Sequence, residues 1–78
     1  MEIKWKDTNI PGVRSFRTSE RTYYFSVQVF GATLEMENTA GGTMWGTRQI
    51  SRRASSVDEP LTDLQLLEAA ERLIRRGL

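Results

Sequence analysis

The side chains that most often carry out enzyme chemistry are missing from this sequence. Its 78 residues contain no histidine and no cysteine, so the commonest general base, the thiol nucleophile and the usual zinc ligands are all absent. Carboxylates, hydroxyls and two lysines remain. We therefore expect a protein that is not an enzyme and that holds no metal ion and no cofactor.

Two groups of carboxylates could still do chemistry. Glu35 and Glu37 are two positions apart in a strand-like segment, so both lie on one face of a sheet. Glycosidases use such a pair, but the outer face of an antiparallel sheet has the same pattern and explains it better here. Asp58, Glu59 and Asp63 lack the spacing and central glycine of a calcium loop. They suit the start of a helix instead.

Nine arginines outnumber the two lysines, which favours planar, bidentate recognition of carboxylates or phosphates. Beside Tyr24, Phe30 or Trp45, the arginines of residues 14–21 and 48–53 would form a basic and aromatic surface for nucleic acid. Interleaved with Glu20, Glu35 and Glu37, they would form a mixed-sign surface for a protein partner. Solvated surface charge is the third interpretation. The arginines fall in three clusters along the chain: Arg14, Arg17 and Arg21; Arg48, Arg52 and Arg53; Arg72, Arg75 and Arg76.

Strands must position most of these residues. Alternation of apolar and polar residues, together with aromatic and β-branched residues, predicts strands, and glycine, proline and asparagine between them predict turns. Residues 13–21 have a weak pattern, typical of either a polar strand or an ordered loop. The clearer strand segments are residues 1–6, 22–30, 33–37 and 43–51.

The segment 22–30 has the strongest strand pattern and defines the two faces of the sheet. Gly31 and Ala32 after it are expected to form a two-residue hairpin connection. Tyr24 and Phe30 then face outward, with Glu35 and Glu37 outward on the next strand. The alternation predicts the opposite set as the core face: Tyr23, Phe25, Val27, Val29, Leu34 and Met36.

A helix is predicted over residues 62–76. Thr62 is a suitable N-cap, and Gln65 three positions later completes a capping box. Gly77 is a natural stop. One apolar stripe is expected to pack on the sheet, formed by Leu66, Leu67, Ala70, Leu73 and Ile74.

These elements predict an α+β fold in one domain over residues 1–78: an antiparallel three- or four-stranded meander over 1–51, a loop over 52–61 and one C-terminal amphipathic helix. The small size also makes a homodimer a plausible way to gain stability. No stretch approaches the roughly 20 apolar residues of a membrane span, and the N-terminus has no signal-peptide pattern. Together with the lack of cysteine, this predicts a cytoplasmic protein with no membrane partner.

The chain resembles two kinds of protein, the first in its order of three strands and a helix and the second in general character only. With Gly12-Val13-Arg14 before the sheet and Trp45-Gly46-Thr47 in its last strand, the chain resembles plant AP2-type and phage-integrase arm-type DNA-binding domains. Those families read DNA with the sheet, where Glu35 and Glu37 would oppose phosphates. In general character, the chain also resembles phage-encoded inhibitors of bacterial defence such as anti-CRISPR proteins, which bind a larger complex and do no chemistry.

We therefore expect a small protein-binding module, of which a phage-type inhibitor of a larger bacterial complex is one form. A nucleic-acid-binding domain that uses an arginine-rich sheet face is the alternative, and a homo-oligomeric structural or assembly protein is the second. The residues expected to contact the partner are Tyr24, Glu35, Glu37, Trp45, Arg48, Arg52 and Arg53.

Overall fold

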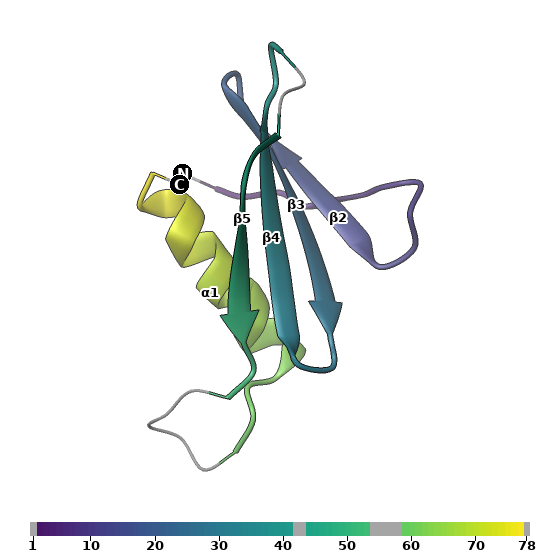
Figure 1. Cartoon of the computed structure of the whole chain (residues 1–78), viewed down its shortest axis with the longest axis vertical. Coiled ribbons are helices and arrows are strands. Elements are labelled where there is room, and N and C mark those ends of the chain that lie inside the picture. Colours follow the sequence, from purple (N-terminus) through teal and green to yellow (C-terminus); the bar gives the residue numbers. More distant parts are fainter. Residues whose placement is uncertain (1, 42–43, 54–58, 78) are drawn as a thin grey trace.

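Five antiparallel strands and one helix form the structure, which is a computed structural model describing residues 2–41, 44–53 and 59–77, with residues 44 and 45 described by their backbone alone. The strands follow one another in a meander, and the helix lies on one side of the sheet (Figure 1). The predicted α+β class is confirmed, but the predicted count of three or four strands is too low. The elements are β1 (Lys6–Asp7), β2 (Val13–Arg17), β3 (Arg21–Gln28), β4 (Gly31–Asn38), β5 (Met44–Ser51) and α1 (Asp63–Arg75).

The ambiguous segment after the first turn is a strand. β2 pairs with β3 along its whole length, from Val13 opposite Ser26 to Arg17 opposite Thr22. Its pattern is weak because α1 packs against β3, β4 and β5 and leaves β2 without a helix above it. A strand with little surface to bury needs few apolar residues, so hydrophobic periodicity alone could not identify it.

The predicted first strand over residues 1–6 is wrong, because only Lys6 and Asp7 pair with β2. The alternation before them has a different cause. Ile3 and Trp5 pack against the core from an extended segment, whereas Glu2 and Lys4 are exposed. The Trp5 ring lies 5.6 Å from that of Phe25, and its Nε1 donates a hydrogen bond of 2.9 Å to Glu71 of α1.

The hairpin between β3 and β4 turns two residues earlier than predicted. Gln28 pairs with Gly31, so Val29 and Phe30 form the turn, and Gly31 and Ala32 belong to β4. Val29 is therefore 94% exposed instead of buried, and Ala32 is fully buried. Gly31 has φ of 155°, and a Cβ there would lie 1.9 Å from the Ile50 carbonyl oxygen. Glycine is needed at this position for the close approach of β5.

The core lies between the sheet and α1. The predicted inward residues of β3 and β4 are buried, apart from Val29 in the turn and Val27, which is half-buried. The helix contributes every third or fourth residue to this layer, as its predicted apolar stripe requires. The buried apolar residues are Tyr23, Phe25, Ala32, Leu34, Met36, Leu66, Ala70 and Ile74. Within the described residues, no helix has the length and apolar character to cross a bilayer.

The start of α1 agrees closely with the prediction. Thr62 accepts a hydrogen bond from the Gln65 amide, and the Gln65 side chain accepts one from the Thr62 amide, so the capping box is complete. The helix ends at Arg75, and Gly77 follows with φ of 94°. Because these signals are local in sequence, they do not depend on the rest of the fold.

Candidate functional site

The sheet face that lies away from α1 is the outer face, formed by the even-numbered residues of β3, the odd-numbered residues of β4 and their cross-strand neighbours. Figure 1 shows that no described helix covers it. Three predicted contact residues meet at its centre: Tyr24 is directly opposite Glu35, and Glu37 lies one pair further along β4. The predicted outward placement of all three is confirmed.

Tyr24 and Glu37 are joined by a short hydrogen bond, in which the phenol donates to Glu37 Oε1 over 2.5 Å. This bond holds the phenolic proton, and partial burial and the negative charge of Glu37 act in the same direction, so the pKa of Tyr24 is raised above its ordinary 10.0. Arg17, on the same face, acts weakly against the shift. The tyrosine therefore stays neutral at physiological pH and fixes the Glu37 carboxylate.

Glu35 differs from its neighbour because it makes no hydrogen bond or ion pair with any residue that the structure describes. Further along the same face, side chains bind one another: Gln28 Nε2 donates to Ser26 over 2.8 Å, and Thr33 donates to Gln28 Oε1 over 3.1 Å. The polar side chains of that half of the outer face thus form hydrogen bonds with one another. The Glu35 carboxylate, by contrast, has no such bond to a described residue and is available to a partner.

The β1–β2 connection adds an apolar wall to this site. Thr8 holds the connection together, because its hydroxyl donates to the Val13 carbonyl over 2.8 Å and accepts from the Ile10 amide over 3.2 Å. Gly12 has φ of 81°, the left-handed region that glycine favours. Ile10 is left 59% exposed at the edge of the outer face.

Together these residues enclose an open hollow of about 250 Å³, lined by Ile10, Val13, Tyr24, Ser26, Glu35 and Glu37. Two carboxylates beside an aromatic ring and apolar side chains suit a cationic group on an apolar stem, such as a lysine or arginine side chain. We call this hollow the acidic site.

Arg52 is tied into the fold. Its guanidinium donates to the carbonyls of Val29, Leu61 and Gln28, over 3.1, 2.8 and 2.9 Å, and to Asp63 Oδ1 over 3.0 Å. Its backbone amide donates to Phe30 O over 2.9 Å, and its carbonyl accepts from the Leu61 amide over 2.8 Å. Arg52 therefore joins the β3–β4 turn to the chain entering α1. We call this set of bonds the Arg52 clamp.

The other predicted contact residues lie away from the acidic site. Arg48 is opposite Leu34 and so is on the α1 side of the sheet, where it is exposed. Arg53 is exposed beyond the end of β5. The side chain of Trp45 is outside the described residues. A contact role for these three residues stays a prediction, as it does for Arg52.

The arginines of the first cluster do not form one surface. Arg14 is opposite Phe25 on the α1 side, whereas Arg17 is opposite Thr22 on the outer face. Arg21 donates from Nη1 to the Gly77 carbonyl over 2.9 Å at the end of α1. Arginines that are close in sequence thus lie on different surfaces, because neighbouring positions on a strand alternate between the two faces of the sheet.

The predicted contact residues did not include Ile10 or Arg14, although Arg14 belonged to one of the arginine clusters. Ile10 lay in a turn, and no local pattern indicates which sheet face a turn will border. A signal for Arg14 did exist: it is two positions before Phe16, which requires burial, so the two share the α1 side.

No protein-family model matches this chain, and neither a curated protein nor a solved structure matches it.

Proposed function

We propose that this chain is a protein-binding module that acts without catalysis and takes a basic segment of its partner on the outer face. The observation that supports this proposal is the acidic site, where Glu35 has no partner among the described residues and Tyr24 holds Glu37 in place. The absence of histidine and cysteine from the whole sequence favours binding over catalysis.

The charges of the outer face favour a protein over a nucleic acid. Glu35 and Glu37 lie at its centre, where they would repel phosphates, and Lys6 and Arg17 lie toward β1 and β2. Neighbouring strands are about 4.8 Å apart, so the positive side and the negative side are separated by about 10 Å. A partner with basic residues over β4 and acidic residues over β2 would match both sides.

Peptide titration followed by NMR tests this proposal. The 15N-labelled chain is titrated with a capped pentapeptide that alternates arginine with isoleucine, and with the same peptide in which glutamate replaces arginine. We expect the basic peptide to shift the amides of Tyr24, Ser26, Glu35 and Glu37, with an affinity in the high micromolar to millimolar range, because exposed ion pairs contribute about 0.2–1 kcal/mol each.

The double variant Glu35→Gln with Glu37→Gln should weaken the basic peptide about fivefold, which corresponds to about 1 kcal/mol. Glu68→Gln is the matched control, because this glutamate is exposed on α1. Equal binding of the acidic peptide, or shifts confined to other surfaces, would contradict the proposal. Micromolar binding of mixed-sequence DNA with a steep salt dependence would favour the nucleic-acid alternative instead.

Two other expectations from the sequence are the phage-type inhibitor, which is one form of this function, and the homo-oligomeric structural or assembly protein, which is a separate alternative. An inhibitor of a larger bacterial complex would use such a binding face, and a homo-oligomer would present it to a second copy. These roles and the cytoplasmic location stay predictions. Analytical ultracentrifugation across a concentration series would detect self-association.

A further inference from the structure

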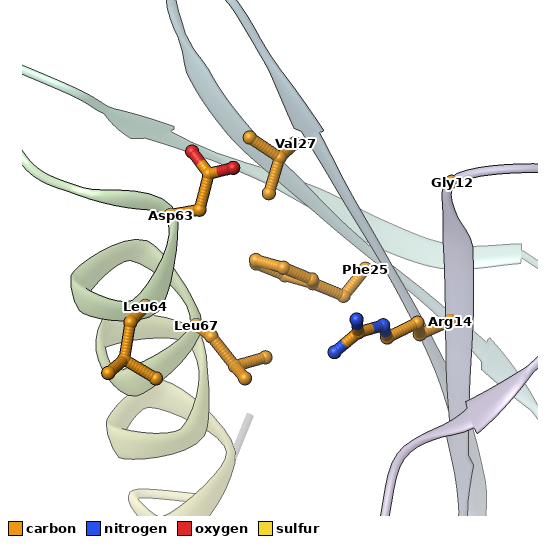
Figure 2. Close-up of a pocket in the computed structure, with 7 residues that line it drawn as sticks. All are labelled: Gly12, Arg14, Phe25, Val27, Asp63, Leu64 and Leu67. Carbon is orange, nitrogen blue, oxygen red and sulfur yellow. The ribbon is translucent and has the colours of Figure 1, made fainter.

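A second hollow lies on the α1 side of the sheet, at the β2 edge. It has a volume of about 410 Å³ and is lined by seven residues, all drawn in Figure 2. It is open because α1 packs on β3, β4 and β5 and does not reach β2. Phe25 and Val27 of β3 form its floor, and Leu64 and Leu67 of α1 form one wall.

Arg14 forms the opposite wall. Figure 2 shows its guanidinium directed from β2 toward Phe25 and Leu67. It makes no hydrogen bond or ion pair with any residue described by the structure. Asp63, at the rim, does not fill this role, because its carboxylate binds Arg52 over 3.0 Å. Asp7 of β1 is opposite Arg14 in the sheet but forms no ion pair with it. The exposed Arg14 guanidinium beside apolar side chains is therefore available to an anionic partner from outside, and its planar fork matches a carboxylate.

The walls favour one kind of anion. The partly exposed Val27 and Leu67 favour apolar groups next to the charge, and the Asp63 carboxylate at the rim disfavours an anion of higher charge such as a phosphate monoester. Leu64 is 64% exposed and extends the apolar wall beyond the hollow. Such an open, extended surface suits a segment of chain better than a small molecule, which would need enclosure.

We propose that this hollow, the Arg14 groove, binds a protein segment in which an aspartate or glutamate lies next to leucine or phenylalanine side chains. The carboxylate would bind the Arg14 guanidinium, and the apolar side chains would cover Val27, Leu64 and Leu67. This surface is on the opposite side of the sheet from the acidic site. The inference does not depend on the proposed function of the outer face.

The test uses three capped tetrapeptides, Leu-X-Leu-Phe with X as glutamate, glutamine or lysine, added to the 15N-labelled chain. We expect the glutamate peptide to shift the amides of Arg14, Val27, Leu64 and Leu67. The glutamate peptide should bind about fivefold more tightly than the glutamine peptide. This ratio of dissociation constants corresponds to about 1 kcal/mol, the contribution of one exposed charge pair. The lysine peptide should bind more weakly still.

Arg14→Gln should abolish the preference for glutamate over glutamine, and Arg14→Glu should reverse it in favour of lysine. Arg17→Gln is the matched control, because Arg17 is on the same strand but on the other face. It should leave the preference unchanged, as should Glu35→Gln with Glu37→Gln. Shifts outside the groove, no shifts with any peptide, or a glutamate preference that persists in a folded Arg14→Gln variant would overturn the proposal.

Discussion

Replacing Arg52 by alanine removes the side-chain bonds of the Arg52 clamp and leaves its two backbone bonds in place. The guanidinium binds three backbone carbonyls and the Asp63 carboxylate, and the arginine side chain is 21% exposed. Each bond to a carbonyl contributes about 1 kcal/mol net, and the ion pair contributes less than about 1 kcal/mol because the Asp63 side chain is 75% exposed. The free energy of unfolding should therefore fall by about 3 kcal/mol.

That loss is large for a chain of this size. At 0.05–0.15 kcal/mol per residue, 78 residues have a net stability of roughly 4–12 kcal/mol. Each 1 kcal/mol shifts Tm by about 4–8 °C in a domain of this length. Arg52→Ala should thus lower Tm by roughly 12–24 °C, measured by far-ultraviolet circular dichroism and compared with urea unfolding.

Two matched variants separate the clamp from general effects of charge. Arg53→Ala removes the neighbouring exposed arginine and should change stability by less than about 0.5 kcal/mol. Arg52→Lys keeps the charge but loses the planar fork, so we expect it to lose about 2 kcal/mol. If Arg52→Ala and Arg53→Ala melt within 2–3 °C of each other, a difference below about 1 kcal/mol, the clamp does not stabilise the fold.

Three further measurements address other contacts. In a 13C NMR titration, Tyr24 should ionise above its ordinary pKa of 10.0, and Glu37→Ala should lower the pKa of Tyr24; an unchanged titration midpoint in this variant would contradict the assignment. The stabilisation by the Tyr24–Glu37 pair is complete below pH 10.0 and is lost as pH rises through the raised pKa. Leu66→Ala should cost about 2–5 kcal/mol in urea unfolding, since Leu66 is fully buried, and a cost below 1 kcal/mol would refute its central place in the core. Trp5→Ala should cost about 2 kcal/mol, because it removes the ring contacts and the bond to Glu71; equal stability would show that residues 2–5 do not hold the sheet to α1.

The parts of the fold that depend on local signals could be predicted from the sequence. The capping box of Thr62 and Gln65 lies within one helical turn, and the apolar stripe of α1 repeats with the helical period, so neither requires knowledge of the sheet. The same holds for the alternation of Leu34 and Met36 with Glu35 and Glu37 on β4. In each case the residues that interact, or share a face, are near each other in sequence.

The predicted position of the hairpin turn was wrong because glycine occurs both in turns and where two backbones approach closely. Gly31 was assigned to a turn, but the structure needs it where β5 approaches β4 too closely for a Cβ. That constraint comes from Ile50, 19 positions away in sequence, and no local pattern contains it. Val29 then had to move from the core face to an exposed turn, which a strand-like composition alone does not predict.

The candidate sites show the same limit. Grouping arginines by sequence placed Arg48, Arg52 and Arg53 on one surface, yet Arg48 lies on the α1 side and Arg52 in the clamp. Most partners of Arg52 are backbone carbonyl oxygens. Every residue has one, so the residue types in the sequence do not indicate which carbonyls Arg52 will bind. Tyr24, Glu35 and Glu37 were found because strand periodicity determines their face.

The Arg52 clamp also sets how much the connection between β5 and α1 can vary. Arg52 and Leu61 are joined in both directions, since the Leu61 amide donates to the Arg52 carbonyl over 2.8 Å and the Arg52 guanidinium donates to the Leu61 carbonyl over 2.8 Å. The entropy of closing a loop grows slowly with its length, by about 0.6 kcal/mol for each doubling. Residues inserted between positions 53 and 61 should therefore leave the relation of sheet to helix intact. This makes the connection a tolerant place for a fluorescent label, an affinity tag or, over evolutionary time, a new binding loop.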